Sequence, residues 1–332
     1  MNSIMLFVFV GLLATAGLAS LVTDSSNDEE ANSCDGLGED DALRPDGSGV
    51  AHGTECDDLV GFEQLLDAEI AGASVDLGAG DDLVDATPDD RMPVELEIDL
   101  GAGDDTIVGA FVGSDLFGGA GDDFFQVEET YGELMTLDGG EGNDTIDART
   151  TDSVDITGGE GDDLIYSMGR PVAGTGYIIN VDGGEGNDTL HVFADSDFAA
   201  GTLSQVGAVN GGEGTDHFIV AIDDQVSDRV DLSAPYPAPW AGLENEAGTG
   251  WRSNVVELAD FDPAAETLEL HLTSPNPDFD VASVHMEGEG VVVTYQSDSY
   301  PDLEMLIACD TSGLSWDQVT LVGAERSVLV GA

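Results

Sequence analysis

Apolar residues recur along residues 75–220 at two fixed distances from a glycine-rich turn. An aliphatic residue lies two positions before the first turn residue, and a second apolar residue lies two positions after the aspartate that closes the turn. The first set is Val75, Ile98, Leu116, Leu137, Ile156, Val181 and Val209, and the second set is Val84, Ile107, Phe125, Ile146, Ile165, Leu190 and Phe218. Because alternate residues of a strand face the same side of a sheet, this spacing predicts a short strand on each side of the turn, each burying one face. The predicted unit is one coil of a flattened β-roll.

The turn between the two strands occurs seven times with little change. With their flanking apolar residues, the copies read VDLGAGDDLVD from Val75, IDLGAGDDTIV from Ile98, LFGGAGDDFFQ from Leu116, LDGGEGNDTID from Leu137, ITGGEGDDLIY from Ile156, VDGGEGNDTLH from Val181 and VNGGEGTDHFI from Val209. Their invariant aspartates are Asp82, Asp105, Asp123, Asp144, Asp163, Asp188 and Asp216. A short repeating pattern of this kind indicates a solenoid whose coils stack on one another.

Successive invariant aspartates are separated by 23, 18, 21, 19, 25 and 28 residues. The interval of 18 residues equals two nonapeptides, which is one complete coil with two turns. One glycine turn per coil is therefore predicted. The extra residues of the longer intervals are expected to form loops on the opposite edge, so that a single edge of the roll carries the turns.

The chemistry of the turn favours a hard cation. Glycines at alternate positions let the backbone bend sharply and expose its carbonyl oxygens. Calcium takes about six to eight oxygen ligands at roughly 2.3–2.6 Å, so carbonyls of one turn and a carboxylate of a neighbouring turn could share an ion. The glycines expected to donate carbonyls are Gly78, Gly80, Gly101, Gly103, Gly118, Gly119, Gly121, Gly139, Gly140, Gly142, Gly158, Gly159, Gly161, Gly183, Gly184, Gly186, Gly211, Gly212 and Gly214. The predicted side-chain ligands are the seven invariant aspartates together with Asp81, Asp104, Asp122, Asn143, Asp162 and Asn187.

The turn resembles the GGxGxDxUx nonapeptide of the haemolysin-type, or repeats-in-toxin (RTX), calcium-binding proteins of bacteria. Five copies match this pattern fully, whereas the first two carry Leu77 and Leu100 in place of the first glycine. The resemblance implies a parallel β-roll with calcium between adjacent coils. Seven stacked turns leave six gaps, so six calcium ions are expected, with fewer if the leucine-bearing copies bind poorly.

Weaker echoes of the turn precede the array within residues 23–70. They are DGLGEDDA from Asp35 and GTECDDLV from Gly53, with equivalent aspartates at Asp40 and Asp58. Two interpretations stay open, degenerate capping coils or an acidic linker, and neither assigns metal to this segment. The three cysteines, Cys34, Cys56 and Cys309, are too few for a disulfide framework, although the first two could form a bridge.

The pattern changes after the roll, which is assigned to residues 71–232. Proline and glycine concentrate in SAPYPAPWAGLENEAGTGW from Ser233, so residues 233–253 are predicted to be a linker. Leu268, Leu270 and Leu272 then alternate with polar residues, and Val291 to Tyr295 is strongly β-prone, which favours a small antiparallel unit of five or six strands over residues 254–332. The segment ELADFDPAAETLELHL, from Glu257, resembles the one that caps the roll in secreted haemolysin-type proteins.

An uncharged apolar run from Ile4 to Val22 precedes the acidic stretch TDSSNDEE. Residues 1–22 are therefore predicted to be a cleaved signal peptide or a retained membrane anchor. The resemblance adds type I secretion, through a C-terminal signal, as another route. Each interpretation places the body of the chain outside the cell or on its surface.

The charge of −62, from 69 acidic residues and only seven arginines and lysines, favours cationic partners. Such a field repels nucleic acid and anionic membranes and attracts divalent cations, so membrane contact is expected only through the N-terminal segment. High acidity also keeps proteins hydrated in salty habitats, and the two explanations are compatible.

The sequence lacks the common catalytic motifs. No HExxH, GxSxG or GxxxxGK[ST] pattern and no EF-hand spacing occurs. The five histidines, His52, His191, His217, His271 and His285, are scattered along the chain, and His191 and His217 are interpreted as surface residues.

We therefore predict an all-β chain, a right-handed parallel β-roll followed by a small antiparallel β cap. The predicted function is that of an exported, noncatalytic calcium-binding protein that folds on calcium and has a structural or adhesive role towards cell-surface or matrix components. The alternative is a secretion and folding module of a toxin or hydrolase-related protein with an unrecognised activity.

Overall fold

The computed structural model describes residues 43, 45–72, 74–87, 95–128, 134–150, 153–169, 179–195, 208–223, 250–272, 280–296, 298 and 302–331. All of them belong to one compact unit, residues 35–332. The predicted leader, the echo at Asp35 and most of the proline-rich segment lie outside the described residues. Within the described part of the chain, no helix is long and apolar enough to cross a membrane.

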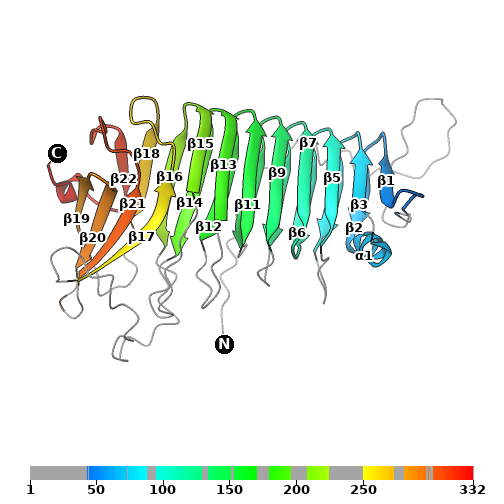
Figure 1. The fold of residues 1–332 in the computed structure, drawn as a ribbon, viewed down its shortest axis with the longest axis horizontal. Helices are drawn as coiled ribbons and strands as arrows, with labels where there is room; N and C mark the ends of the chain where they lie inside the picture. Colours follow the sequence, from blue (N-terminus) through cyan, green and yellow to red (C-terminus); the bar gives the residue numbers. More distant parts are fainter. Residues whose placement is uncertain are drawn as a thin grey trace. The chain divides into compact units, whose positions relative to one another are not determined.

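From β1 to β18 the strands alternate along the chain between two sheets, so that each of these coils contributes one strand to each sheet (Figure 1). Sheet A contains, in spatial order, β1 (Val50–Thr54), β3 (Ser74–Gly78), β5 (Glu97–Ala102), β7 (Asp115–Ala120), β9 (Met135–Glu141), β11 (Val154–Glu160), β13 (Ile179–Gly186), β15 (Ala208–Gly214), β17 (Gly250–Leu258), β21 (Asp302–Ala308), β20 (Gly290–Gln296) and β19 (Asp280–Glu287). Sheet B contains β2 (Leu59–Gly61), β4 (Leu83–Ala86), β6 (Thr106–Ala110), β8 (Phe124–Glu128), β10 (Thr145–Thr150), β12 (Leu164–Gly169), β14 (Thr189–Asp195), β16 (His217–Asp223), β18 (Thr267–Leu272) and β22 (Val319–Val322).

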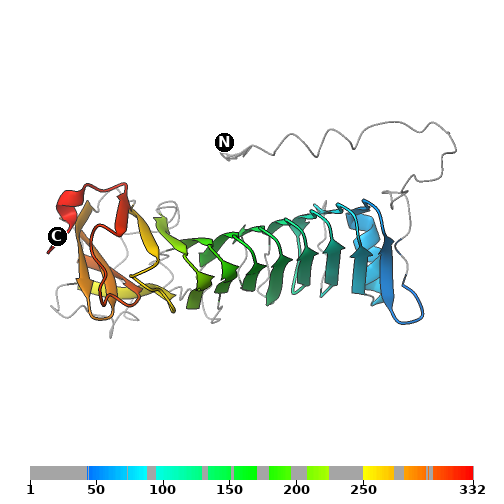
Figure 2. The ribbon, with the colours of Figure 1, turned by 90° about the horizontal axis from the view of Figure 1, so that it is seen from above.

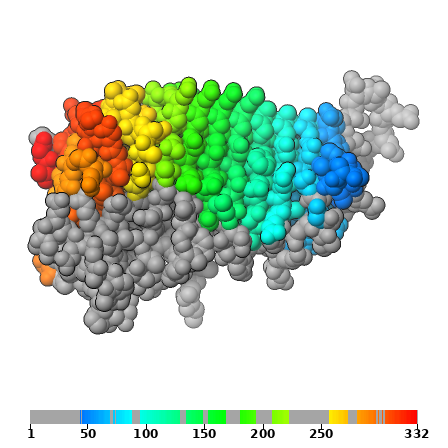
Figure 3. All heavy atoms as spheres, in the orientation of Figure 1, coloured from blue at the N-terminus to red at the C-terminus, as the bar shows by residue number. Residues whose placement is uncertain are grey.

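Equivalent residues of successive coils lie opposite one another. In sheet A, Ile156 pairs in parallel with Leu137 on one side and with Val181 on the other. In sheet B, Ile165 likewise pairs with Ile146 and Leu190. The coils therefore stack in chain order, which Figures 2 and 3 show as an ordered succession of colours. This arrangement confirms the predicted parallel β-roll.

The core lies between the two sheets and is built from the apolar positions that flank each turn. All fourteen predicted inward residues are buried, with at most 2% of each residue exposed. Because burial of one such side chain contributes about 1.5–3 kcal/mol, the two positions of each coil supply much of the stacking energy. The period-two pattern therefore identified the core correctly.

A degenerate coil begins the roll. The echo GTECDDLV lies on β1 and β2, which pair in parallel with β3 and β4, so the interpretation as an acidic linker is wrong for residues 50–61. Helix α1 (Phe62–Ala71), which the sequence did not reveal, follows at once and buries Leu65 and Ala68. The Gln64 side-chain oxygen accepts the N–H of Gly61 at 2.7 Å, which satisfies a backbone donor where the helix starts.

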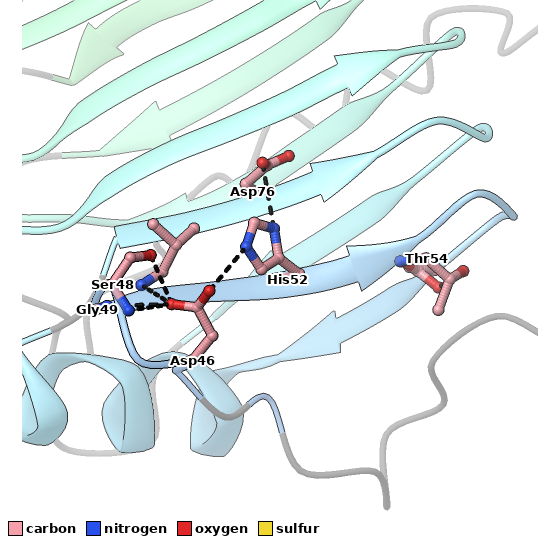
Figure 4. Close-up of polar contacts among 8 residues, drawn as sticks. Asp46, Ser48, Gly49, His52, Thr54 and Asp76 are labelled. Carbon is pink, nitrogen blue, oxygen red and sulfur yellow. Dashed lines mark hydrogen bonds and ion pairs between the residues drawn. The ribbon is translucent and has the colours of Figure 1, made fainter.

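A compact turn protects the first edge of sheet A (Figure 4). Oδ1 of Asp46 accepts the N–H groups of Ser48 and Gly49 at 2.6 and 3.2 Å. The Ser48 hydroxyl, and then its N–H, lower the pKa of Asp46 to about 2. The imidazole of His52 lies between Asp46 and Asp76, 3.8 and 3.3 Å from their carboxylates. A short strand with charged neighbours is a common way to block pairing with another chain.

The roll continues further than the sequence predicted. Strands β17 and β21 extend sheet A in parallel, β18 and β22 extend sheet B, and β17 begins at Gly250 inside the predicted linker. Among the described strands, antiparallel ladders join only β19, β20 and β21, so the cap has three antiparallel strands rather than five or six. Leu268 and Leu270 instead stack on Phe218 and Val220 of the previous coil. Alternation identifies a strand with one buried face but does not distinguish parallel from antiparallel partners.

Candidate metal site

The invariant aspartates form a buried row along one edge of the roll, between the end of each sheet A strand and the start of the next sheet B strand. Each residue of this inner row is at most 2% exposed, although a carboxylate is costly to bury. The row comprises Asp82, Asp105, Asp123, Asp144, Asp163, Asp188 and Asp216. The structure therefore brings all seven predicted aspartates together.

Hydrogen bonds link the inner row from coil to coil in one direction. The backbone N–H of Asp144 donates to Oδ1 of Asp163 at 2.8 Å, and the N–H of Asp163 donates to Oδ1 of Asp188 at 2.8 Å. The same bond joins every neighbouring pair from Asp58 to Asp216, with lengths of 2.6–2.9 Å. One oxygen of each aspartate is thus used to hold the coils in register.

A second, exposed row runs beside the first with its hydrogen bonds reversed. The N–H of Asp162 donates to Oδ1 of Asn143 in the preceding coil at 3.0 Å, and the N–H of Asn187 donates to Oδ1 of Asp162 at 2.8 Å. This outer row comprises Asp57, Asp81, Asp104, Asp122, Asn143, Asp162, Asn187 and Thr215. The six outer residues predicted as ligands therefore form a separate, exposed row, whose hydrogen bonds connect each turn to the next.

The other oxygen of each inner aspartate is buried without a hydrogen-bond partner. This holds for Oδ2 of all seven residues. Buried carboxylate oxygens rarely lack a donor, because losing water without compensation costs about 1–3 kcal/mol or more for a charged group. A continuous line of such oxygens indicates a cation or proton that completes their bonding.

The first glycine of each full motif faces this oxygen. A Cβ placed on Gly158 would lie 2.2 Å from Oδ2 of Asp163 and 2.3 Å from the carbonyl oxygen of Gly183 in the next coil. The parallel pairing of β11 and β13 also skips this position, passing from Thr157 to Gly159. The φ angle of Gly158 is not positive, so glycine is required there because of the limited space and not because of the backbone conformation. Gly159 and Gly161, in contrast, have φ of 125° and 135°.

A carboxylate oxygen paired with the carbonyl oxygen of the next coil is a donor set that suits calcium. We call each such pair an oxygen cradle. Cradles face Gly118, Gly139, Gly158 and Gly183. The Cβ position of Gly53 also lies within 2.5 Å of Oδ2 of Asp58 and the carbonyl oxygen of Leu77, but there Oδ2 already accepts the N–H of Thr54. The leucine-bearing turns have an aliphatic side chain at this position, and both Leu77 and Leu100 are fully buried.

No three His, Cys, Asp or Glu side chains converge on one point among the residues that the structure describes. Each cradle contains a single carboxylate, so its remaining ligands would have to be backbone carbonyls and water. The residues present therefore fit calcium, which accepts such ligands, better than a metal that requires several side chains.

Burial changes the acidity of the inner row. Loss of solvent, reinforced by neighbouring carboxylates, raises the pKa of Asp123 to about 8 and that of Asp163 to about 7. Desolvation likewise raises the pKa of Asp82 to about 7 and those of Asp105, Asp144 and Asp188 to about 6. The N–H from the preceding coil acts in the opposite direction in each case. A row with these pKa values competes for protons near neutral pH whenever no cation neutralises it.

Each end of the inner row has its own termination. At the first coil, Asp58 accepts the N–H of Thr54 at 2.7 Å and its hydroxyl at 2.8 Å. At the last, the Asp260 carboxylate accepts the N–H groups of Gly211 and Gly212, each at 2.9 Å. Neither Thr54 nor Asp260 was among the predicted site residues. The echo at Gly53 and the segment after Glu257 were the only signals for them.

Three histidines lie near one another on the outer face of sheet B, although they are scattered in sequence. Nε2 of His271 lies 2.5 Å from Oε1 of Glu269, and Nε2 of His217 lies 4.0 Å from Oε2 of the same residue. The ring of His191 lies 5.6 Å from that of His271. This group is separate from the inner row, on the sheet face rather than at its edge.

The cysteines are in different environments. Cys56 is disulfide-bonded. Cys309 is a free thiol whose pKa is raised to about 11 by burial. Cys34 lies outside the described residues.

Comparison of this chain with protein-family models, with characterised proteins and with solved structures finds no match.

Proposed function

We propose that this protein is an exported calcium-binding β-roll of the repeats-in-toxin kind, which folds when calcium fills the oxygen cradles. The observation that carries the proposal is the row of buried Oδ2 atoms without hydrogen-bond partners. Four of these atoms share a cradle with the glycine carbonyl of the next coil. We therefore propose four ions within the repeats, instead of the six expected from the number of gaps.

Calcium would stabilise the roll by mass action. At ten times its dissociation constant, one site contributes about 1.4 kcal/mol, so four independent sites contribute about 6 kcal/mol. This is comparable with the net stability of a domain, about 5–15 kcal/mol. Extracellular calcium modules bind with constants of about 10⁻⁴–10⁻³ M, so the roll would stay loose in a cytoplasm low in calcium and fold after export.

We assign the folded roll a structural or adhesive role at the cell surface or in the extracellular matrix. The absence of common catalytic motifs from the sequence supports this assignment, as does the use of the invariant aspartates in coil stacking. The strongly negative chain would reach other acidic surfaces most readily through shared divalent cations.

Calcium titration followed by far-ultraviolet circular dichroism tests the proposal. The full-length chain should show little β signal in a chelator and gain it cooperatively as calcium is added. Magnesium is the matched control, because it holds its water more tightly and prefers octahedral sites, and it should restore much less signal. An equal β signal in chelator and in calcium would refute calcium-dependent folding.

A further inference from the structure

The surroundings of the last aspartate of the inner row differ from those of the preceding aspartates. Asp216 is 1% exposed, and its Oδ2 has no hydrogen-bond partner, as in the preceding coils. A Cβ on Gly211 would meet Oδ2 of Asp216 at 2.2 Å, yet the three nearest atoms all belong to that aspartate. No carbonyl oxygen lies nearer to this position than 3.0 Å, so the carbonyl found at 2.3–2.5 Å in the cradles has no counterpart at the last coil.

Glu266 takes the position of the aspartate in the coil that follows. Thr267 pairs with His217, and its N–H donates to the carbonyl of Asp216, as the N–H of His217 donates to the carbonyl of Asp188. Glu266 therefore follows Asp216 in the stack. It is buried, with 6% of its surface exposed, and its Oε2 accepts the N–H of Asp262 at 2.7 Å.

A third carboxylate adjoins this pair. Asp260 is fixed over the last glycine turn by the N–H groups of Gly211 and Gly212. Burial, followed by the negative charges of Asp216 and Asp260, raises the pKa of Glu266 to about 7. None of the ion pairs in the described part of the chain neutralises Asp216, Asp260 or Glu266. Two buried carboxylates and a third beside them thus have no counter-charge among the described residues.

We propose that Asp216, Asp260 and Glu266 form an additional calcium site at the C-terminal end of the repeats. Carboxylates there replace the glycine carbonyl that the repeat cradles use. The inference rests on the proposed function, since Asp216 is also the last member of the inner row. The three side chains do not converge on one point in this structure, so calcium binding requires them to move closer together.

This site differs from the repeat cradles in charge and in what it connects. Three carboxylates give it more negative charge than a cradle with one, and ligand charge is one determinant of calcium affinity. Calcium should therefore fill the terminal site before the cradles. The ion would also join the last repeat coil to the coil of β17 and β18, whose direct sheet A contact is only two residue pairs, Ala208 with Glu257 and Val209 with Leu258.

Equilibrium dialysis and calorimetry with calcium, on the full chain, test the site. Glu266→Gln and Asp260→Asn should each bind one ion fewer than the wild type and lose the tightest binding phase. Glu257→Gln is the matched control, because it removes the same charge from an exposed position on β17 and should leave stoichiometry unchanged.

The outcomes separate the two proposals. If the wild type binds no calcium, the proposed function fails. If it binds calcium and both Glu266→Gln and Asp260→Asn keep the wild-type stoichiometry and tightest phase, the terminal site alone is refuted. Asp260→Asn decides the matter if Glu266→Gln does not fold, because an asparagine oxygen can still accept a glycine N–H.

Discussion

The N–H of Asp144 donates to Oδ1 of Asp163 in the next coil at 2.8 Å, while Oδ2 of Asp163 stays buried without a hydrogen-bond partner. One carboxylate thus performs two tasks that can be separated. Oδ1 fixes the register of the coils, and Oδ2 is available to a cation. The exposed outer row fixes the same turns through bonds of opposite direction, so register does not depend on the inner row alone.

Asp163→Asn should separate the two tasks. The asparagine oxygen can still accept the N–H of Asp144, while its amide replaces Oδ2 and faces the carbonyl of Gly183. We expect higher stability in chelator, because a buried charge is removed, and a loss of about 1.4 kcal/mol of calcium stabilisation at ten times the dissociation constant. The β signal in chelator and the calcium concentration that gives half of the full β signal measure the two effects.

Asp162→Asn is the control for this change. The neighbouring residue is exposed in the outer row, and Asn143 and Asn187 already occupy the same position in other coils. Its calcium stabilisation should match that of the wild type. Equal losses in the two variants would mean that the inner aspartate has no special role in binding.

Gly158→Ala should block one cradle. The new Cβ would lie 2.2 Å from Oδ2 of Asp163 and 2.3 Å from the carbonyl oxygen of Gly183, distances that require both atoms to move. We expect a cost of about 1–3 kcal/mol and the loss of one bound calcium. Gly288→Ala is the control, because nothing lies within 4 Å of its Cβ position. Unchanged calcium stoichiometry in folded Gly158→Ala would contradict the cradle as a site.

The sequence predicted the parts of this fold that follow from a strict period. Every aliphatic position that flanks a turn, such as Ile156 and Ile165, is buried as expected, because the face of a strand residue depends only on its spacing. It predicted both Asp162 and Asp163 as ligands, although only Asp163 occupies the invariant position of the turn. Their different burial depends on the backbone path through the turn, which only the folded coil defines.

The end of the roll was harder to predict for a different reason. Leu268 and Leu270 have the alternation of any strand with one buried face, and their partners, Phe218 and Val220, are set by the coil on which they stack. Asp260 carries no repeat pattern at all. Its contact with Gly211 depends on a neighbouring coil, and local sequence does not encode such contacts directly.

Stability in chelator should rise as the pH falls. The pKa values of Asp123, about 8, and Asp163, about 7, exceed the ordinary value of 3.8, so folding takes up protons. A raised pKa contributes stability that is fully present below the unfolded value and is lost as the pH rises through the folded value. The β signal in chelator should therefore be larger at about pH 5.5 than at about pH 8.5.

Calcium should weaken or reverse this dependence, because protons and calcium compete for the same oxygens. Calcium affinity is expected to fall as the pH drops from 8 towards 6, the range of the inner-row pKa values. General repulsion within an acidic chain also favours lower pH, so the double variant Asp123→Asn with Asp163→Asn is needed as a control. Its pH dependence in chelator should be shallower. An unchanged slope would assign the effect to overall charge.

The first coils should stay folded when calcium is removed. Leu77 and Leu100 are fully buried where later copies have glycine, Cys56 is disulfide-bonded, and α1 buries Leu65 against the first coils. Hydrogen exchange in chelator, read by mass spectrometry, should therefore show protection in β1 to β4 and little in β9 to β16, whereas calcium should protect both regions. Leu77→Gly should abolish the protection in chelator, since Leu→Ala changes in a core already cost about 2–5 kcal/mol. Equal loss of protection in all coils of the wild type would show that the leucine-bearing turns depend on calcium as much as the glycine-bearing ones.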